Sequence, residues 1–239
     1  MAEFFRRVEK KYMLTRKQHE QIVKEIKNKM IGDPNGMSTI CNIYFDSPQY
    51  DLIRKSIEKP VYKDKVRIRS YNIPNKNSEV YLEIKRKLYG VVSKRRIEIK
   101  LNDAESYISG VKIKHKDVQV LNELDYYFKL YNLIPVAYIS YDRSAYYSKD
   151  DKNFRVTFDN NITARTYDLK LENGIYGQKI LNDDNYIMEV KTLKSMPLWF
   201  VKNIISKLEI QPCKYSKYGE AYKNIIMKKE KSRRLVNYV

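Results

Sequence analysis

The chain has 239 residues, enough for one large domain or two small ones with a substantial core. Hydrophobic residues make up 43% of the chain and charged residues 32%, a balance that excludes an intrinsically disordered protein. Lys and Arg outnumber Asp and Glu by 47 to 29, and this net charge of +18 favours a polyanionic partner such as nucleic acid, an anionic membrane or a phosphate compound.

Cysteine and histidine are too few for several common kinds of site. Cys41 and Cys213 have no CxxC spacing and only two histidines are present, so we expect neither a zinc site nor a disulfide framework. The N-terminus lacks the continuous apolar segment of a signal peptide, and no stretch reaches the ~18 apolar residues of a membrane span. The sequence therefore predicts a cytoplasmic protein without a transmembrane segment.

The first half of the chain alternates between strand and helix patterns. Strands are predicted at residues 4–14, 39–45, 65–71, 79–88 and 91–101. Thr15 and Gln18 form a capping box that opens a helix, and its apolar positions are Ile22, Val23, Ile26 and Met30. Residues 32–36 form a turn cluster. Ser47 and Pro48 predict the N-cap and first residue of a short helix.

The second half continues in the same manner. Asp103 is predicted to cap a short helix and Asp117 a longer one. Strands are predicted at 136–147, 154–163 and 186–192, with a polar hairpin loop at 148–153 and helices at 195–209 and 216–229. The fold class is α+β: one domain of about eight strands, mostly joined by hairpins, over residues 1–227. A basic tail at 228–239 follows it.

Charged residues occur two apart inside most of these strands, so each pair lies on one face, while the flanking residues are apolar. The pairs are Glu9/Lys11, Arg67/Arg69, Glu83/Lys85, Arg96/Glu98 and Glu189/Lys191, and Arg155 and Asp159 share a face with Thr157 between them. Such a face can be left to water. Alternatively, the sheet can close into a barrel with the charges inside, and burying this many cations would then require an anionic ligand.

Each pair also has an ordinary explanation. Arg67 and Arg69 suit bidentate phosphate binding, but a solvated strand face would look the same. Glu83 and Lys85, facing Lys94, Arg96 and Glu98 across a hairpin, would also form cross-strand salt bridges on an exposed sheet. Arg143 has the same strand parity as Tyr141 and Ile139, which favours an enclosed position.

Two further segments suggest phosphate chemistry. Glu189 offers the carboxylate oxygens that Mg²⁺ and Mn²⁺ prefer, although a paired surface glutamate would look alike. Lys214 and Lys217 precede the last helix, where a phosphate would be well placed. The sequence has no GxxxxGK[ST] or GxGxxG motif, so any nucleotide would be bound without a P-loop.

Taken in order, these segments resemble the VTC (vacuolar transporter chaperone) catalytic domain of the triphosphate tunnel metalloenzyme (CYTH-like) superfamily, from Phe5 to about Tyr222. The matching segments are Glu9–Tyr12, Tyr44–Asp46, Arg67–Arg69, Leu82–Lys85, Lys94–Arg96, Tyr141–Tyr146, Arg155–Asp159, Met188–Thr192 and Lys214–Tyr218. Each segment is short, but the ordered set is specific. The resemblance implies a closed antiparallel barrel of about eight strands that forms a basic tunnel, with peripheral helices.

The resemblance also implies roles for individual residues. Glu189 would be the metal ligand, for Mn²⁺ or Mg²⁺. The other implied catalytic residues are Lys11, Arg67, Arg69, Lys85, Arg143 and Arg155. Substrate phosphates would be bound by these six cations together with Lys94, Arg96, Lys191, Lys214 and Lys217.

One departure from the superfamily pattern helps to choose the branch. The hydrolase and cyclase branch carries ExExK on its first strand, whereas Arg7 takes the place of the first glutamate here. The implied activity is therefore a metal-dependent polyphosphate polymerase, a phosphotransferase that moves the ATP γ-phosphate onto inorganic polyphosphate. A triphosphate or polyphosphate hydrolase and a non-catalytic polyphosphate- or RNA-binding module remain alternatives.

The expected partners are ATP and inorganic polyphosphate. Nucleic acid is disfavoured, because the charged faces carry Arg, Lys and Glu where RNA recognition uses exposed aromatic side chains. The basic tail that includes Lys228 and Arg234 is a candidate contact for a membrane or another protein.

Overall fold

The computed structural model describes residues 8–34, 36–58, 61–89, 91–193 and 195–230. The chain divides into two compact units. Unit 1 consists of Met1–Ser38, Tyr141–Ile162 and Leu181–Tyr215, and unit 2 of Thr39–Ser140, Thr163–Ile180 and Ser216–Val239. The strands β7 (Ile134–Ser148) and β8 (Arg155–Arg165) contribute residues to both units.

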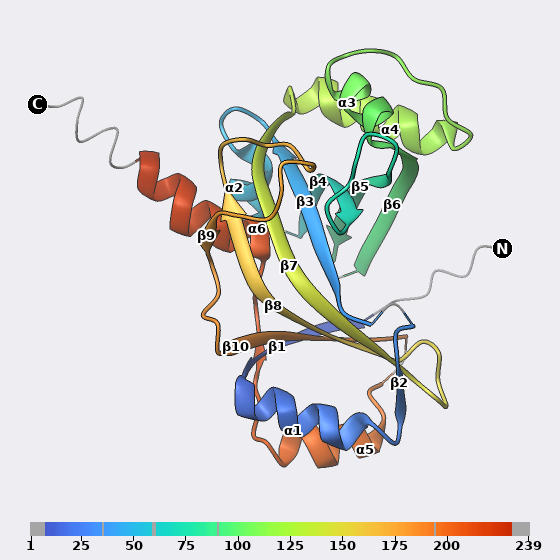
Figure 1. The fold of residues 1–239 in the computed structure, drawn as a ribbon, viewed down its shortest axis with the longest axis vertical. Helices are drawn as coiled ribbons and strands as arrows, with labels where there is room; N and C mark the ends of the chain where they lie inside the picture. Colours follow the sequence, from blue (N-terminus) through green and yellow to red (C-terminus); the bar gives the residue numbers. More distant parts are fainter. Residues whose placement is uncertain (1–7, 35, 59–60, 90, 194, 231–239) are drawn as a thin grey trace, which may run out of the picture. The chain divides into compact units, whose positions relative to one another are not determined.

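Unit 1 is an antiparallel sheet with helices against it (Figure 1). Its other strands are β1 (Val8–Thr15), β2 (Met30–Gly32), β10 (Asn185–Thr192) and β11 (Pro212–Cys213). The strand β10 pairs with β1 on one side and β8 on the other. The helices are α1 (Arg16–Ile26) and α5 (Leu198–Phe200), which continues into the π-helical turn η1 (Val201–Ser206).

The predicted capping box at the start of α1 is confirmed. The Thr15 side chain accepts from the Gln18 backbone N–H, and the Gln18 side chain accepts from the Thr15 N–H in return. The helix buries Ile22 and Ile26 in the apolar core of unit 1. It ends at Ile26, however, and Met30 belongs to β2, because residues 27–29 form a turn.

Unit 2 is built around the antiparallel strands β3 (Ser38–Asp46), β4 (Tyr62–Tyr71), β5 (Glu79–Leu88) and β6 (Val91–Lys100). The short strand β9 (Gln178–Lys179) pairs with the end of β8. The helices α3 (Leu101–Ile108) and α4 (Val118–Tyr131) lie beside β5 and β6 in Figure 1. The remaining helices are α2 (Asp51–Ile57), α6 (Lys217–Ala221) and the π-helical turn η2 (Tyr222–Ile226).

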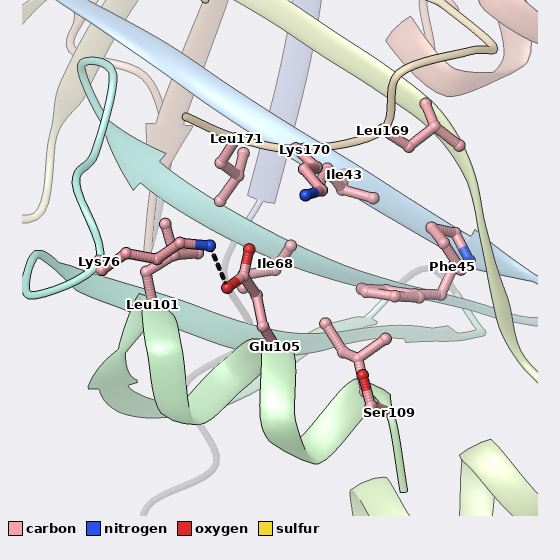
Figure 2. A pocket seen from close by; sticks show the side chains of 12 residues that line it. Ile43, Phe45, Ile68, Lys76, Leu101, Glu105, Ser109, Leu169, Lys170 and Leu171 are labelled. Atoms are coloured by element: carbon pink, nitrogen blue, oxygen red, sulfur yellow. Dashed lines mark hydrogen bonds and ion pairs between the residues drawn. The ribbon is translucent and has the colours of Figure 1, made fainter. Parts of the chain in front are cut away.

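One face of the β3–β6 sheet is apolar, as the alternation in the sequence predicts. Ile43, Phe45, Val66, Ile68 and Leu82 are all buried on it, in a core that α3 and α4 help to cover. A pocket of about 330 Å³ lies at this face. Figure 2 shows Ile43, Phe45 and Ile68 in its lining, with the Lys76–Glu105 ion pair beside them. The opposite face is therefore left to the charged residues.

The prediction of a closed eight-stranded barrel is wrong. The eight long predicted strands are present, but the sheet has eleven strands in the described part of the chain, and β2, β9 and β11 are the short additions. The hydrogen-bonded order is open, from β11 through β1, β10, β8, β7, β3, β4 and β5 to β6. The strand β6 is at one edge of the sheet, and its exposed charged residues Lys94, Arg95 and Arg96 discourage pairing with a further strand.

Two helix starts also differ from the prediction. The helix α2 begins at Asp51, not at Pro48, because the buried Asp46 carboxylate accepts from the N–H groups of Leu52 and Ile53 and so takes over the capping role. The helix α3 begins at Leu101, which places Asp103 in its first turn. A carboxylate there interacts favourably with the helix dipole, but Asp103 is not the N-cap residue. Asp117 is the N-cap residue of α4, as predicted, but its side chain makes no capping hydrogen bond.

Arg165 organises the irregular segment after β8. Its buried guanidinium donates to the carbonyl oxygens of Asp168, Lys170, Gly174 and Tyr176 at 2.9–3.2 Å. The side chain also lies 3.6 Å from the ring centroid of Tyr138. These contacts satisfy the hydrogen-bonding capacity of a buried cation through carbonyl oxygens and aromatic rings.

The predicted division at residues 227 and 228 stays a prediction. Residues 227–230 are helical, and Lys229 donates to the Thr166 hydroxyl at 2.8 Å and lies over the Tyr167 ring. The rest of the predicted tail, including Arg234, lies outside the described residues, as do Arg7 and Gly90. None of the helices in the described part of the chain combines the length and apolar character needed to cross a membrane.

Candidate functional site

The charged face of unit 2 is arranged in cross-strand rows on β4, β5 and β6. One row aligns Lys65, Lys85 and Lys94, and the next aligns Arg67, Glu83 and Arg96. Adjacent side chains in such rows are close enough to interact directly. Cations therefore outnumber carboxylates by five to one in these two rows.

Glu83 is the centre of this face. Its buried carboxylate accepts from Arg67 Nε at 2.8 Å, and it lies 3.9 Å from Arg69 Nε and 2.5 Å from Lys94 Nζ. Burial alone would raise the pKa of Glu83, but Arg67, Arg69 and Lys94 outweigh it and lower the pKa to about 2. One carboxylate thus holds three cations in place and leaves an excess of positive charge.

Two uncharged side chains complete the positioning of the arginines. Arg67 Nη1 donates to the Tyr44 hydroxyl at 3.1 Å, and Arg69 Nε donates to the Asn42 side-chain oxygen at 3.0 Å. Asn42 in turn donates to the Ile139 carbonyl oxygen at 3.0 Å. The charge pattern of the sequence does not predict a role for Asn42. Asn42 lies two residues before Tyr44 on β3, however, so both side chains are on the charged face.

Lys94 differs from the arginines in its ability to lose its proton. Burial and the nearby Arg69 and Arg67 cations outweigh the attraction of Glu83 and lower the pKa of Lys94 to about 8. The side chain is still 38% exposed. It is therefore an accessible ammonium group that titrates just above neutral pH.

The other unit 2 cations named from the sequence lie in different surroundings. Lys85 is half-buried in the row beside Lys94, and the exposed Arg96 lies with its guanidinium 4.4 Å from the Tyr81 ring centroid. Lys217 is the first residue of α6, whose N-cap Ser216 accepts from Lys65 Nζ at 2.7 Å.

Unit 1 has its own charged face, centred on two carboxylates. Arg143 donates two hydrogen bonds to the buried Asp159, from Nε at 2.6 Å and from Nη2 at 2.8 Å. The same Nη2 lies 3.7 Å from Glu189. The pKa of Arg143 is raised, because Asp159, Tyr141 and Glu189 together outweigh the opposing effect of its burial.

Lysines surround Glu189 on the same face. Lys191 Nζ lies 3.5 Å from Glu189 and 4.0 Å from Glu9. Lys11 is the cross-strand neighbour of Glu189, and its Nζ donates to the Tyr215 carbonyl oxygen at 2.8 Å. Lys214 is exposed. The structure therefore brings Arg143, Lys191 and Glu189 into contact and holds Lys11 by a backbone oxygen.

Two polar atoms on this face are buried without a hydrogen-bond partner among the described residues. They are Arg155 Nε and Thr157 Oγ1. Thr157 lies across from Glu189, and Arg155 lies across from Lys191 and has its guanidinium 4.7 Å from the Tyr147 ring centroid. Buried polar atoms are seldom left unsatisfied, so a water molecule or a polar ligand is expected next to these two.

No group of three or more His, Cys, Asp or Glu side chains within the described ranges is arranged to hold a metal ion. Glu189 and Asp159 both contact Arg143, so two carboxylates lie at one point of the unit 1 face. Mg²⁺ is commonly bound by one or two carboxylates together with substrate phosphates and water. These residues therefore fit a metal ion that arrives with phosphate ligands, and they do not form a complete protein site.

A family model described as the VTC domain matches residues 6–226 of the chain. No curated protein sequence matches significantly. Among solved structures, a proposed adenylate cyclase from Bacillus halodurans has a TM-score of 0.54 at 12% identity, with 88% of this chain and 95% of that chain covered. This score indicates a shared fold, and the identity is too low to transfer an activity.

Two other solved structures have lower scores. A proposed adenylate cyclase from Vibrio parahaemolyticus has a TM-score of 0.49 at 12% identity, with 92% of this chain and 97% of that chain covered. The Mimivirus capping enzyme triphosphatase has a TM-score of 0.34 at 11% identity, with coverages of 84% and 87%.

Proposed function

The chain belongs to the VTC domain family, and on this premise we propose that it is a metal-dependent polyphosphate polymerase. In this proposal the γ-phosphate of ATP is transferred to the end of a growing inorganic polyphosphate chain. ATP as the donor also agrees with the cytoplasmic location predicted from the sequence.

The observation that carries the proposal is the convergence of cations on Glu83. Arg67, Arg69 and Lys94 all contact this one buried carboxylate. Arginine pairs oriented by fixed hydrogen bonds are well suited to phosphate oxygens. A phosphate chain would bind to this group of cations.

The proposed mechanism relies on positioning and charge, as phosphoryl transfer usually does. Arg67 and Arg69 would bind and orient phosphate groups in unit 2, with Lys85, Lys94 and Arg96 around them. In unit 1, Glu189 would hold the metal ion, and a bound Mn²⁺ or Mg²⁺ would withdraw charge from phosphate oxygens. The phosphate-binding residues proposed there are Lys11, Arg143, Arg155, Lys191 and Lys214. Lys217 in unit 2 is proposed as a further phosphate ligand.

A terminal phosphate is already ionised at neutral pH, so its attack needs no strong general base.

The direct test is to incubate the protein with ATP and Mn²⁺ and separate the products by length. We expect polyphosphate chains and one molecule of ADP for each phosphate residue added to them. Free phosphate without chains would replace the proposal with a hydrolase. Binding of polyphosphate without any turnover would make it a binding module, and RNA binding that tripolyphosphate cannot displace would point to nucleic acid.

The titration of Lys94 gives a second prediction. With a pKa of about 8, its ammonium is charged at pH 7 and mostly neutral at pH 9. We therefore expect the affinity for tripolyphosphate to fall by about threefold to tenfold over this range, because one charge-assisted contact is lost. Isothermal titration calorimetry at several pH values measures the change.

The matched variant for this experiment is Lys94→Arg, which keeps its charge at pH 9 and should flatten the pH dependence. Lys100→Arg, on the same strand, should leave the wild-type pH dependence intact. An equal fall in affinity in the Lys94→Arg protein would show that another group, or the ligand itself, is responsible.

A further inference from the structure

An aromatic cluster borders the charged face of unit 2. Tyr81 lies two residues before Glu83 on β5, and Tyr71 lies two residues after Arg69 on β4, so both rings are on the charged face. The rings meet edge to face, with centroids 5.9 Å apart at 87°. Arg96 covers the Tyr81 ring from β6, with its guanidinium carbon 4.4 Å from the centroid. Three strands thus contribute to one tyrosine–arginine cluster, formed by Tyr71, Tyr81 and Arg96.

The cluster is accessible and held in one arrangement. Tyr71 is 52% exposed, Arg96 is exposed and Tyr81 is half-buried. The Tyr81 hydroxyl donates to Glu98 at 3.3 Å, so the side chain is held by its hydroxyl and by contact with the Tyr71 ring. A side chain that is already ordered loses little conformational entropy when a ligand binds against it.

The cluster lies next to the proposed phosphate ligands along the strands. Tyr81 is the cross-strand partner of Arg69, and Glu83 is the partner of Arg67. Two residues of a strand span about 7 Å, so Tyr81 lies one such step beyond the row that aligns Arg67, Glu83 and Arg96. A triphosphate bound to Arg67 and Arg69 would then have room for its nucleoside end against the tyrosines.

We infer that the tyrosine–arginine cluster binds the nucleobase of a nucleoside triphosphate donor, with the base stacked on Tyr81 beside Tyr71 and Arg96. Aromatic rings and guanidinium planes are the usual stacking partners of unpaired bases. The inference rests on the proposed function and adds to it a subsite that distinguishes ATP from inorganic triphosphate. Arg96 contributes its guanidinium plane to this subsite and retains its charge for the nearest phosphate.

The experiment compares two ligands that share the triphosphate and differ in the base. Binding of a nonhydrolysable ATP analogue, used in place of ATP because ATP would be consumed, and of tripolyphosphate is measured by calorimetry with Mn²⁺ for the wild-type protein and for Tyr81→Ala, Tyr81→Phe and Tyr126→Ala. We expect Tyr81→Ala to weaken ATP binding by about tenfold and to leave tripolyphosphate binding unchanged. Tyr81→Phe keeps the ring and should bind ATP like the wild type. Tyr126 is an exposed tyrosine on α4 and serves as the matched control.

The outcomes separate the subsite from the proposed function. Equal weakening of ATP and tripolyphosphate by Tyr81→Ala, or no weakening of either, would overturn the nucleobase subsite and leave the phosphate site standing. Loss of ATP affinity in Tyr126→Ala as well would also overturn it. A wild-type protein that binds neither ligand would overturn the proposed function and the subsite together.

Discussion

Replacing Glu189 by glutamine is expected to reduce polyphosphate formation from ATP by about 100- to 1,000-fold at saturating Mn²⁺, a loss of the size seen when one charge-stabilising group is removed from an active site. Glutamine has almost the same shape and can still accept hydrogen bonds, but it lacks the negative charge that a divalent cation requires. The fold should persist, because Asp159 keeps its two hydrogen bonds to Arg143.

Two measurements make this result specific to the metal. In the wild type, Mn²⁺ should strengthen tripolyphosphate binding, and in Glu189→Gln this effect of Mn²⁺ should disappear. Glu25→Gln is the control, since Glu25 forms an exposed ion pair with Lys207 in the same unit. Synthesis at the wild-type rate by a folded Glu189→Gln protein would rule out the metal assignment.

Replacing Glu83 by glutamine is expected to lower the free energy of unfolding by about 3 kcal/mol at pH 7. The substitution leaves Arg67, Arg69 and Lys94 crowded together without the carboxylate that offsets their repulsion. Glu79→Gln is the matched control, because Glu79 is an exposed residue of the same strand, and it should change stability by less than about 0.5 kcal/mol. Urea unfolding with an unchanged slope measures both variants.

The acid response of the wild type follows from the same contacts. The folded pKa of Glu83, about 2, is below its ordinary value of 4.5, so its ionised form stabilises the fold above pH 4.5. That contribution, about 3 kcal/mol, is lost as the pH falls from 4.5 towards 2. Glu83→Gln should lack this part of the acid sensitivity. A variant that loses stability with acid as steeply as the wild type would show that Glu83 is not the group responsible.

Strand parity accounts for most of what the sequence predicts correctly. The alternation of apolar and charged residues around Arg67, Glu83 and Glu189 is a local property, and it correctly assigns each side chain to a face. The eight long strands and the capping box at Thr15 follow from similarly local patterns. The functional roles assigned to the charged residues remain predictions, since parity shows where a side chain points and not what it binds.

Long-range pairing accounts for what the sequence does not predict. Asp46 caps α2 from the end of β3 and also accepts from the Tyr218 hydroxyl, a contact 172 residues away in the chain. No local pattern marks such a partner. The open order of the sheet could not be predicted from local patterns either. Barrel closure depends on whether the two edge strands pair with each other, and the sequence of an edge strand resembles that of any other charged strand.

The position of Glu83 also has a consequence for how the strands find one another during folding. If β5 slipped by one residue against β4 and β6, its apolar side chains would move to the wrong face, and burial would oppose the slip. A slip by two residues would keep Leu82 and Ile84 on the apolar face, so burial alone hardly distinguishes it from the native pairing. Such a slip would, however, place Lys85 or Tyr81 between Arg67 and Arg96, where the native alignment has the carboxylate. A single buried negative charge among cations therefore selects one alignment from several that the hydrophobic pattern would accept.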